Sequence, residues 1–592
     1  MTRLIQRQAD NATARRLQDA GLHPLLARLY AGRGIRSSAE LKTELAGLLP
    51  PEGLKGIADA ARLLADAIEA QARMVIVADY DCDGATACAV GIRALRLLGA
   101  RDVHYFVPDR VVHGYGLSPS VVAEVAKLEA DILITVDNGI ASVEGVAAAQ
   151  ALGMTVLVTD HHLPGDTLPT AEVIVNPNQP GCTFASKNLA GVGVMFYTAL
   201  ALRAELRRRG HFCQSVRTEP VEVQSGEGFD KLSPNGQNKP EPNLASLLDL
   251  VALGTVADVV KLDPNNRLLV RQGIARMRSD RMCAGIRALF AIAGRNPARA
   301  TPFDMGFALG PRLNAAGRLS DMSLGIECLL TDDYARAFSI AQQLQALNLE
   351  RREIEAEMRD AALATLDATR IDEGPAISLF EPEWHQGVIG IVAGRIKDQA
   401  HRPTIAFARA TDHDGEGELK GSGRSITALH LRDALDLITK RHPDLILKFG
   451  GHAMAAGLTI RERDFERFRK IFADTVAELV PPADLQRSLE TDGALETGYM
   501  SLDMARMIDD EIWGQGFAAP LFEDVFHVDK QRLLKDRHLK LTLSKPGAVF
   551  EAIRFNCAEP VPEQIRAAYR LSVNEYQGVA SLQLMLEYFE PA

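Results

Sequence analysis

Three aspartates follow one apolar run at a spacing that could bind divalent metal ions. Asp79, Asp81 and Asp83 come directly after MVIVA (74–78), and Gly84 and a predicted helix follow them. If the chain is extended there, alternate side chains project to one face and the three carboxylates converge. Three such anions repel one another strongly unless a cation neutralises them. The spacing therefore predicts a metal site, and the N-terminus of the helix behind it would favour a phosphate.

Two further apolar runs end in residues of the same kind. ILITV (132–136) is followed by Asp137, and TVLVT (155–159) is followed by Asp160, His161 and His162. Asp258, within ALGTVADVV, is a fourth candidate, although a lone aspartate is more often a helix cap than a ligand. Carboxylate and imidazole ligands suit Mn²⁺ or Mg²⁺ better than a thiolate-seeking metal. Several shared carboxylates suggest two ions about 4 Å apart, an arrangement that hydrolyses phosphoryl bonds.

Two other interpretations of the acidic segment are open. A solvated acidic turn is common for two aspartates, but less so for three between a buried strand and a helix. An EF-hand calcium loop would need a glutamate at its twelfth position, which this segment lacks, and it would not follow a strand. A metal site of another kind is therefore the favoured interpretation.

The elements that position these residues form a repeating pattern. From about residue 56 to 200, helix-length amphipathic segments alternate with short apolar runs, which also include VHYFVP (103–108) and EVIVN (172–176). Each run is β-branched and apolar on both faces, as expected of strands buried in a parallel sheet. The pattern predicts an α/β fold, whose sites lie outside the carboxyl ends of the strands.

The remaining segments differ in character. The first 21 residues are typical of a charged helix rather than a signal peptide, and residues 214–243 predict a disordered surface insertion, since they are rich in Pro, Gly, Ser, Asn and Gln. A long connecting helix is predicted to start with Thr331 as its N-cap. A second α/β segment is expected from about 370 to 470. The last hundred residues are strand-rich, which indicates a small β-barrel.

Composition sets broad limits on the protein. A chain of 592 residues is expected to form two to four domains. The sequence has no run of 18 apolar residues, which argues against a membrane partner, and its seven cysteines without a CxxC pair indicate a reducing, cytoplasmic location. The net charge of −11 counts weakly against a nucleic-acid partner, because binding depends on local patches.

Nine motifs along the chain carry a family resemblance. They are ADYDCDGATA (78–87), VPDRVVHGYGLS (107–118), TVDNGI (135–140), VTDHH (158–162), ALGTVADVV (252–260), GPRLNAAGR (310–318), EWHQGVIGIVAGRI (383–396), GSGRS (421–425) and GGHAMAAGL (450–458). In this order and spacing the chain resembles the DHH phosphoesterase superfamily, named for the triplet at 160–162. Within that superfamily it is most similar to the RecJ-type single-strand-specific 5′→3′ exonucleases.

The resemblance implies a domain order. An N-terminal helical segment would cover residues 1–45, and a parallel-sheet DHH catalytic domain, carrying the insertion, would cover 46–330. A connecting helix (331–368) and a second α/β, DHH-associated substrate-binding domain (369–472) would follow. Residues 473–592 would form an OB-fold β-barrel.

The resemblance also implies roles for individual residues. Six would bind the two metal ions: Asp79, Asp81, Asp83, Asp137, His161 and Asp258. Asp137 would bridge both ions, His162 would contact the scissile phosphate or a metal, and Asp160 would orient a histidine. Eight residues, several of them in what we interpret as glycine-rich loops, would hold the substrate: Arg110, Arg312, Asn314, Arg318, Ser422, Arg424, Ser425 and His452. For each arginine alone, a structural salt bridge is an equally good interpretation.

The barrel carries a run of basic residues near its first strands. These are Lys530, Arg532, Lys535, Arg537, His538 and Lys540. OB-folds bind single strands with a basic groove, although such a run is also typical of a solvated face.

The implied activity is a metal-dependent exodeoxyribonuclease acting on single-stranded DNA. It would release 5′ mononucleotides by a two-metal-ion mechanism with Mn²⁺ or Mg²⁺, in DNA recombination and repair. A helicase and a single-strand-binding protein are candidate partners, and a monomer is the expected state. One alternative is a DHH enzyme for small substrates, against which the segment 475–592 counts. The other is a non-catalytic scaffold, against which the complete ligand set counts.

Overall fold

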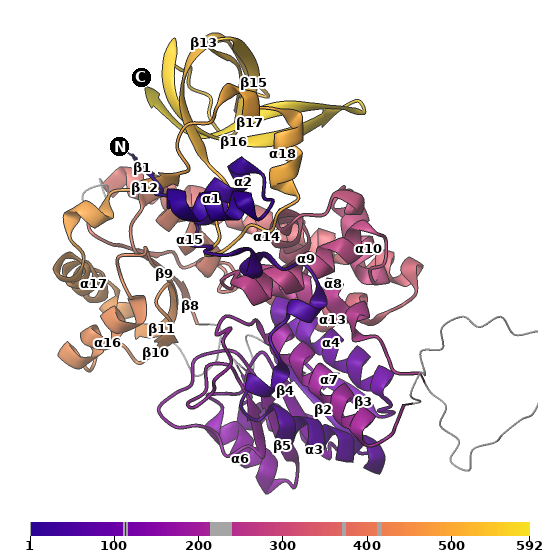
Figure 1. Ribbon diagram of the computed structural model, residues 1–592. Coiled ribbons are helices and arrows are strands. Elements are labelled where there is room, and N and C mark those ends of the chain that lie inside the picture. Colours follow the sequence, from indigo (N-terminus) through magenta and orange to yellow (C-terminus); the bar gives the residue numbers. More distant parts are fainter. Residues whose placement is uncertain (1, 110–112, 114–115, 213–239, 370–373, 411–416) are drawn as a thin grey trace, which may run out of the picture. The chain divides into compact units, whose positions relative to one another are not determined.

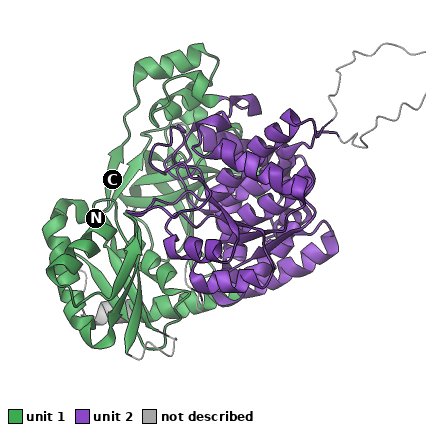
Figure 2. Cartoon of the chain, turned by 90° about the horizontal axis from the view of Figure 1, so that it is seen from below, with its two compact units in different colours: residues 1–41, 349–513, 518–592 green, residues 42–348, 514–517 purple. Residues whose placement is uncertain are grey.

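The computed structural model describes residues 2–109, 113, 116–212, 240–369, 374–410 and 417–592. Two compact units are distinguished in Figure 2. Unit 1 comprises residues 1–41, 349–513 and 518–592, and unit 2 comprises residues 42–348 and 514–517. Of the insertion predicted over 214–243, residues 214–239 lie outside the described residues.

Unit 2 is built around a parallel five-stranded sheet, which confirms the predicted α/β fold. Its strands, in spatial order, are β3 (Val103–Phe106), β2 (Met74–Ala78), β4 (Ile132–Val136), β5 (Thr155–Thr159) and β6 (Val173–Val175). All five coincide with the predicted apolar runs. Ala78 pairs with Val136, and Val136 pairs with Thr159, so the central strands end at the same level.

Helices cover both faces of this sheet, as Figure 1 shows. Val75 and Val77 of β2 pack with α5 (Pro119–Ala126) and α6 (Val143–Ala151). On the other face lie α3 (Ile57–Ala70), α4 (Cys82–Leu98) and α7 (Gly191–Arg208). Because side chains alternate along a strand, Ile76, which lies between the two valines, faces the helices on the other side of the sheet. There it contacts α4 at Gly91. Burial on both faces explains why the runs are apolar throughout.

The second half of unit 2 is helical. Its main helices are α8 (Leu248–Ala257), α9 (Pro264–Arg278), α10 (Ala284–Ile292), α12 (Gly310–Leu319) and α13 (Ser323–Leu330). Helix α8 packs on α4, where a Cβ on Gly254 would lie 2.1 Å from the hydroxyl oxygen of Thr86. This close approach holds the end of α8 beside the start of α4.

The long predicted helix is α14 (Tyr334–Thr369), which passes from unit 2 into unit 1. The prediction that Thr331 caps it is wrong. The carboxylate of Asp333 accepts the backbone N–H of Ala335 at 2.8 Å, whereas the Thr331 hydroxyl accepts only the N–H of Asp333 itself. The carboxylate two residues further along reaches the first free helical N–H groups, so it displaces the hydroxyl as the cap.

Unit 1 contains the second predicted α/β segment. Its sheet has the order β10 (Lys448–Gly451), β11 (Ala455–Arg461), β9 (Glu418–Arg424), β8 (Thr404–Arg409) and β7 (Ile377–Phe380). The β7–β8 pair is parallel and the other pairs are antiparallel. Three helices accompany it, namely α15 (Ile389–Ala400), α16 (Leu431–Arg441) and α17 (Phe465–Leu479).

The C-terminal residues form a closed barrel, as predicted. Its strands, in order around the barrel, are β13 (Phe522–Leu534), β14 (His538–Lys545), β15 (Ala548–Arg554), β17 (Val579–Pro591) and β16 (Gln564–Tyr576). The contact that closes the barrel is short, since β15 and β17 pair only through Ala552 with Leu584 and Ile553 with Met585.

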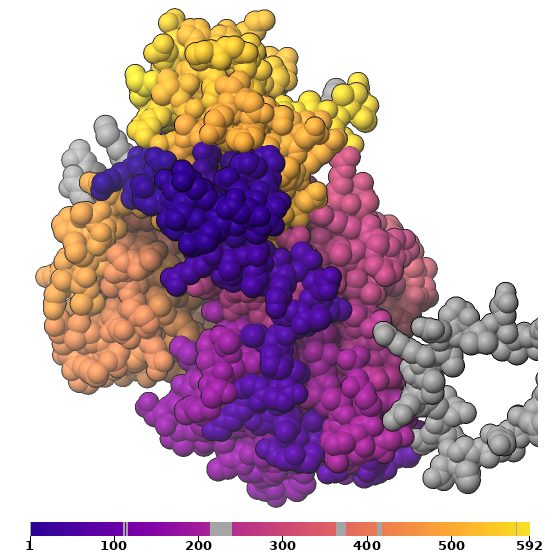
Figure 3. Space-filling view, in the orientation of Figure 1, coloured from indigo at the N-terminus to yellow at the C-terminus, as the bar shows by residue number. Residues whose placement is uncertain are grey.

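The N-terminal segment belongs to unit 1, and its first residues are not helical as predicted. Strand β1 (Arg3–Gln6) runs parallel to β12 (Ser488–Thr491), and only then follow α1 (Asn11–Asp19) and α2 (Pro24–Ala31). The side chains of Arg7 and Arg33 both bind the buried Asp492. In Figure 3 the indigo N-terminal atoms accordingly lie against orange C-terminal atoms. A strand partner almost 500 residues away overrides the local helical preference.

None of the described helices combines the length and apolar character that a bilayer crossing requires. Each described cysteine is a free thiol.

Candidate metal centre

The acidic and histidine residues gather at the carboxyl edge of the unit 2 sheet. Asp79 follows β2, Asp137 follows β4 and Asp160 follows β5. Strand β2 lies between β3 and β4, so the connections that leave β2 and β3 run in opposite directions across the sheet. Such a reversal opens a crevice at the strand ends, which is the usual place for a site in this architecture.

The predicted extended course of residues 79–83 is wrong, because α4 already begins at Cys82. Asp81 is its N-cap, and its carboxylate accepts the N–H of Gly84 at 3.0 Å. Asp83 lies in the first turn, where its two oxygens accept the N–H groups of Gly191 at 2.6 Å and Val192 at 3.0 Å. The helix start, rather than an extended strand, therefore sets the directions of the last two carboxylates.

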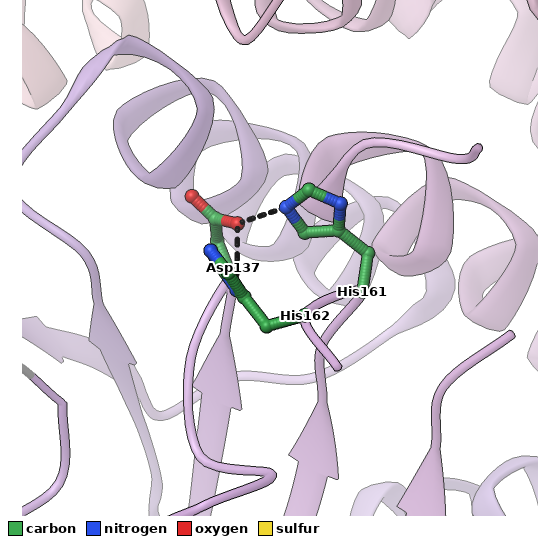
Figure 4. Close-up of side chains that lie close together, drawn as sticks. All are labelled: Asp137, His161 and His162. Carbon is green, nitrogen blue, oxygen red and sulfur yellow. Dashed lines mark ion pairs between the residues drawn. The ribbon is translucent and has the colours of Figure 1, made fainter. Parts of the chain in front are cut away.

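His161 lies at the centre of the cluster. Its Nε2 atom is 3.1 Å from Oδ1 of Asp137, 3.5 Å from Oδ2 of Asp258 and 4.0 Å from Oδ2 of Asp83. Figure 4 shows the approach of both histidines to Asp137. Asp258 follows the last residue of α8, so the packing of α8 on α4 delivers this carboxylate to the cluster.

Asp160 holds the adjacent histidine in place. Its Oδ1 lies 2.8 Å from Nδ1 of His162 and also accepts the backbone N–H groups of His161 and His162. Its Oδ2 accepts the N–H of Ile140 at 2.9 Å. Burial is the largest single influence on Asp160 and opposes its charge, but the hydrogen bond and charge of His162, the charge of His161 and the hydrogen bond from Ile140 together hold the pKa of Asp160 below its usual value. Burial is the largest single influence on His162 and would lower its pKa, yet the hydrogen bond to Asp160 and the charges of Asp160, Asp79 and Asp81 together raise that pKa to about 9.

Three carboxylates of the cluster, those of Asp83, Asp137 and Asp258, are destabilised as anions. Burial, together with the charge of Asp81, raises the pKa of Asp83 to about 7. Burial followed by the charges of neighbouring aspartates raises the pKa values of Asp137 and Asp258 well above the usual range. Buried carboxylates repel one another and lose hydration, and a bound cation relieves both effects.

The donor atoms form groups of the size a metal ion needs. The atoms of Asp79, Asp81 and Asp137 lie within 4.8 Å of one another, and so do those of Asp83, His161 and Asp258. The two groups share no residue, and together they contain the six predicted ligands. Asp137 also groups with His161 and His162, which places it beside both sets. Oxygen-rich groups with one imidazole fit Mn²⁺ or Mg²⁺.

Some residues at the site were not predicted from the sequence. A Cβ on Gly191 would lie 2.5 Å from the Cβ of Asp137, so only glycine fits there. The buried amide of Asn138 donates to the carbonyls of Val77 and Val136, tying two strand ends together. Asp137 itself has φ 62°, a left-handed conformation uncommon outside glycine. The Asp-Asn-Gly sequence is a turn signal that could have indicated this conformation.

The asparagines after β6 were also missed. The amide of Asn176 donates to the carbonyl of His162 at 2.9 Å, and that of Asn178 donates to the carbonyl of His161 at 2.6 Å. They fix the backbone that carries both imidazoles.

Three of the predicted substrate residues lie on α12 in unit 2. The GPRLNAAGR motif is a helix and not the predicted loop. The side-chain oxygen of Asn314 accepts the N–H of Cys82 at 2.7 Å, and Arg312 donates to the carbonyl of Ala308. A Cβ on Gly317 would overlap the carbonyl of Tyr80, so α12 packs directly on the acidic segment. Arg318 lies on the same helix, half-buried, while Arg110 lies outside the described residues.

The other predicted substrate residues belong to unit 1. Ser422 and Arg424 lie on strand β9, so the predicted GSGRS loop is also wrong. Arg424 donates to the hydroxyl of Ser422 at 3.2 Å, and the buried Ser425 donates to the carbonyl of Leu429 at 2.8 Å. His452 follows β10, and its backbone N–H donates to the carbonyl of Ala455 at 2.8 Å.

The basic run of the barrel follows the β13–β14 hairpin. Arg532 and Lys540 are cross-strand partners, and Lys540 forms an ion pair with Glu551 at 2.8 Å. One member of the run is thus already neutralised.

A parallel sheet with carboxylates and paired histidines at its carboxyl edge defines a metal-dependent phosphoesterase. Residues 73–218 match the DHH family N-terminal domain, residues 373–478 match the DHHA1 domain, and residues 491–588 match the RecJ OB domain. The single-stranded-DNA-specific exonuclease RecJ of Salmonella typhimurium strain LT2 is 46% identical over 599 residues, which cover 99% of each chain. This chain therefore belongs to the RecJ family, as the sequence resemblance predicted.

Solved structures agree with this assignment. RecJ of Thermus thermophilus in complex with Mn²⁺ superposes with a TM-score of 0.79 at 30% identity, covering 100% of this chain and 79% of that one. The complex of the same protein with Mg²⁺ gives a TM-score of 0.73 at 28% identity, covering 100% and 78%. Both metals are ones that the donor atoms of unit 2 fit.

Proposed function

We propose that this protein is a single-stranded-DNA-specific 5′→3′ exonuclease that releases 5′ mononucleotides in DNA recombination and repair. The proposal is carried by two groups of metal-ligating atoms that share no residue, so that each group could hold one ion. The first group is Asp79, Asp81 and Asp137, and the second is Asp83, His161 and Asp258. Two ions in such a pair activate water and stabilise the leaving oxygen of a phosphodiester. The name of the Salmonella relative supports the polymer and its single-stranded state.

Individual side chains of the cluster would position the metal ions and the scissile phosphate. Asp137, which groups with donors on both sides, would bridge the two ions. Asp160 engages Nδ1 of His162, and we expect this histidine to contact an oxygen of the scissile phosphate. Asn176 and Asn178 hydrogen-bond to the backbone carbonyls of the two histidines and would thereby hold both imidazoles in place. Fixed positions matter because hydrolysis needs the reacting atoms already aligned.

Substrate selection would rest on other parts of the chain. We expect Arg312, Arg318 and Arg424 to bind backbone phosphates, because a planar guanidinium matches phosphate oxygens. The closed barrel with its basic run is the expected track for a single strand. A monomer in the cytoplasm, working with a helicase and a single-strand-binding protein, completes the proposal.

The proposal is tested with 5′- and 3′-labelled single and double strands, each incubated with Mn²⁺ or Mg²⁺. We expect mononucleotides released from the 5′ end of single strands only, and no release by the Asp137→Ala variant. Equal degradation of duplexes, or release from the 3′ end, would contradict the specificity. Metal-dependent activity in the variant would contradict the assignment of the site.

A further inference from the structure

A cavity of about 460 Å³ lies in unit 2, at the opposite end of the two helices that carry metal-site residues. Arg93 and Arg96 line it from the last turns of α4, and Asp249 lines it from the first turn of α8. Asp83 lies ten residues before Arg93 on α4, about 15 Å along the helix axis. Asp258 follows the other end of α8. The cavity is therefore separate from the metal centre.

Cationic side chains dominate the polar lining of this cavity. Arg276 and Arg281 join the two arginines of α4, whereas the acidic lining residues are Asp249 and Asp332. Arg93 pairs with Asp332 at 2.9 Å, and Arg96 donates to the carbonyl of Val103 at 3.2 Å. Arg93 also donates to the backbone carbonyls of Leu329 and Leu330, so most of its donors are already used. Arg276 donates to the carbonyl of Arg281, and Arg281 donates to the hydroxyl of Ser279. Each guanidinium has five N–H donors, so Arg96, Arg276 and Arg281 retain most of their capacity for a multiply charged anion. A planar guanidinium fork matches the oxygens of phosphate as well as those of a carboxylate, and several arginines together suit the multiply charged phosphate.

Two buried polar atoms add a second and independent feature. Asp249 is 0% exposed, and its Oδ2 accepts the N–H of Cys283 at 2.7 Å. Its Oδ1 is buried without a hydrogen-bond partner among the described residues, and so is Nε of Arg276. A buried carboxylate oxygen of this kind costs free energy unless a donor reaches it. A ligand with an N–H group for the carboxylate oxygen and an anionic oxygen for the arginines would therefore complement this lining.

We propose that this cavity binds a nucleoside 5′-phosphate. The arginines would hold the phosphate, and Oδ1 of Asp249 would accept an N–H of the base. Leu247, Leu250 and Leu330 supply an apolar surface for the flat ring. The volume lies within the range of pockets for ligands of this size.

The test titrates deoxyguanosine 5′-monophosphate into the full-length Asp137→Ala protein in a chelator, with calorimetric detection. We expect saturable binding of one nucleotide per chain, because the substitution and the chelator prevent metal-dependent binding of the nucleotide at the metal centre. The double substitution Arg96→Ala/Arg281→Ala should weaken binding about tenfold or more, because each charged hydrogen bond contributes strongly. Both arginines are exposed, so these substitutions leave the fold intact.

Matched controls separate the cavity from general charge effects. Arg62→Ala removes an arginine of unit 2 outside the cavity, and Asp332→Asn removes a negative charge at its rim, so neither should weaken binding. Asp249→Asn should remove the preference for the nucleotide over inorganic phosphate. Absence of binding, or binding that survives the double substitution, would overturn the proposal. Equal affinity for inorganic phosphate in the Asp137→Ala protein would also overturn it, because the base would then contribute nothing.

Discussion

The substitution Asp137→Asn tests whether electrostatic repulsion shapes the metal centre. Asparagine has nearly the same volume as aspartate but no charge, and Asp137 is only 2% exposed. The donor atoms of Asp79 and Asp81 lie within 4.8 Å of those of Asp137. We expect the metal-free variant to be more stable than the unsubstituted protein, and the metal-loaded variant to be less stable.

The magnitude follows from this separation. At 4.8 Å and an effective dielectric constant of about 20, two full charges repel by about 3.5 kcal/mol. Burial and neighbouring charges raise the pKa of Asp137, so protonation already relieves part of this repulsion. A gain of about 1–3 kcal/mol in the free energy of unfolding remains for the metal-free variant. Conversely, Mn²⁺ at a hundred times its Kd would stabilise the unsubstituted protein by about 2.7 kcal/mol, which the variant would forgo.

Thermal unfolding with and without Mn²⁺ measures both effects. The order of the two unfolding midpoints should reverse between the two conditions. Compared with the unsubstituted protein, the variant should unfold several degrees higher in a chelator and lower in Mn²⁺. Exonuclease activity should fall at least about a hundredfold, since we expect the loss of a metal ligand to remove several kcal/mol of transition-state stabilisation. Asp166→Asn, at an exposed aspartate of the same unit, is the control and should change neither curve.

One result would refute the reasoning. If Asp137→Asn lowers the unfolding midpoint in a chelator, the carboxylate stabilises the metal-free fold, and repulsion does not govern the cluster. An equal upward shift by Mn²⁺ in both proteins would show that Asp137 is not a ligand.

Three further predictions concern single contacts. Asp160→Asn weakens the 2.8 Å contact with His162, so kcat should fall about 10–100-fold at unchanged metal content, and a parallel loss of metal would instead make Asp160 a ligand. Gly191→Ala places a methyl group 2.5 Å from the Cβ of Asp137, so the Mn²⁺ concentration that gives half-maximal activity should rise. An unchanged Mn²⁺ titration would contradict this account of the packing. Asp492→Ala leaves the buried Arg33 without its partner at 2.9 Å, so urea unfolding of unit 1 should lose about 3–5 kcal/mol while Mn²⁺ binding stays unchanged. A loss below about 1 kcal/mol would contradict that account.

The sequence alone determined the elements of the catalytic sheet and the chemistry at their ends. The runs before Asp79, Asp137 and Asp160 are local signals, because a strand buried on both faces must be apolar at every position. The carboxyl ends of parallel strands meet at one edge, so the convergence of these residues follows from local patterns. The C-terminal barrel was predictable for a similar reason, since its strands are long and adjacent in sequence.

Tertiary structure decided how the site is assembled. The two N–H groups that bind Asp83 lie 108 and 109 residues further along the chain, and no local pattern relates them to it. Asp258 is a weak candidate ligand in the sequence, since a lone aspartate is more often a helix cap, and its carboxylate reaches the cluster because α8 packs on α4. The GPRLNAAGR and GSGRS motifs resemble loops because of their glycines, yet Gly317 is small so that α12 can pack against the carbonyl of Tyr80. The acidic segment itself turns into a helix three residues earlier than predicted, because Asp81 acts as the N-cap of α4, a local signal that the assumption of an extended chain overlooked.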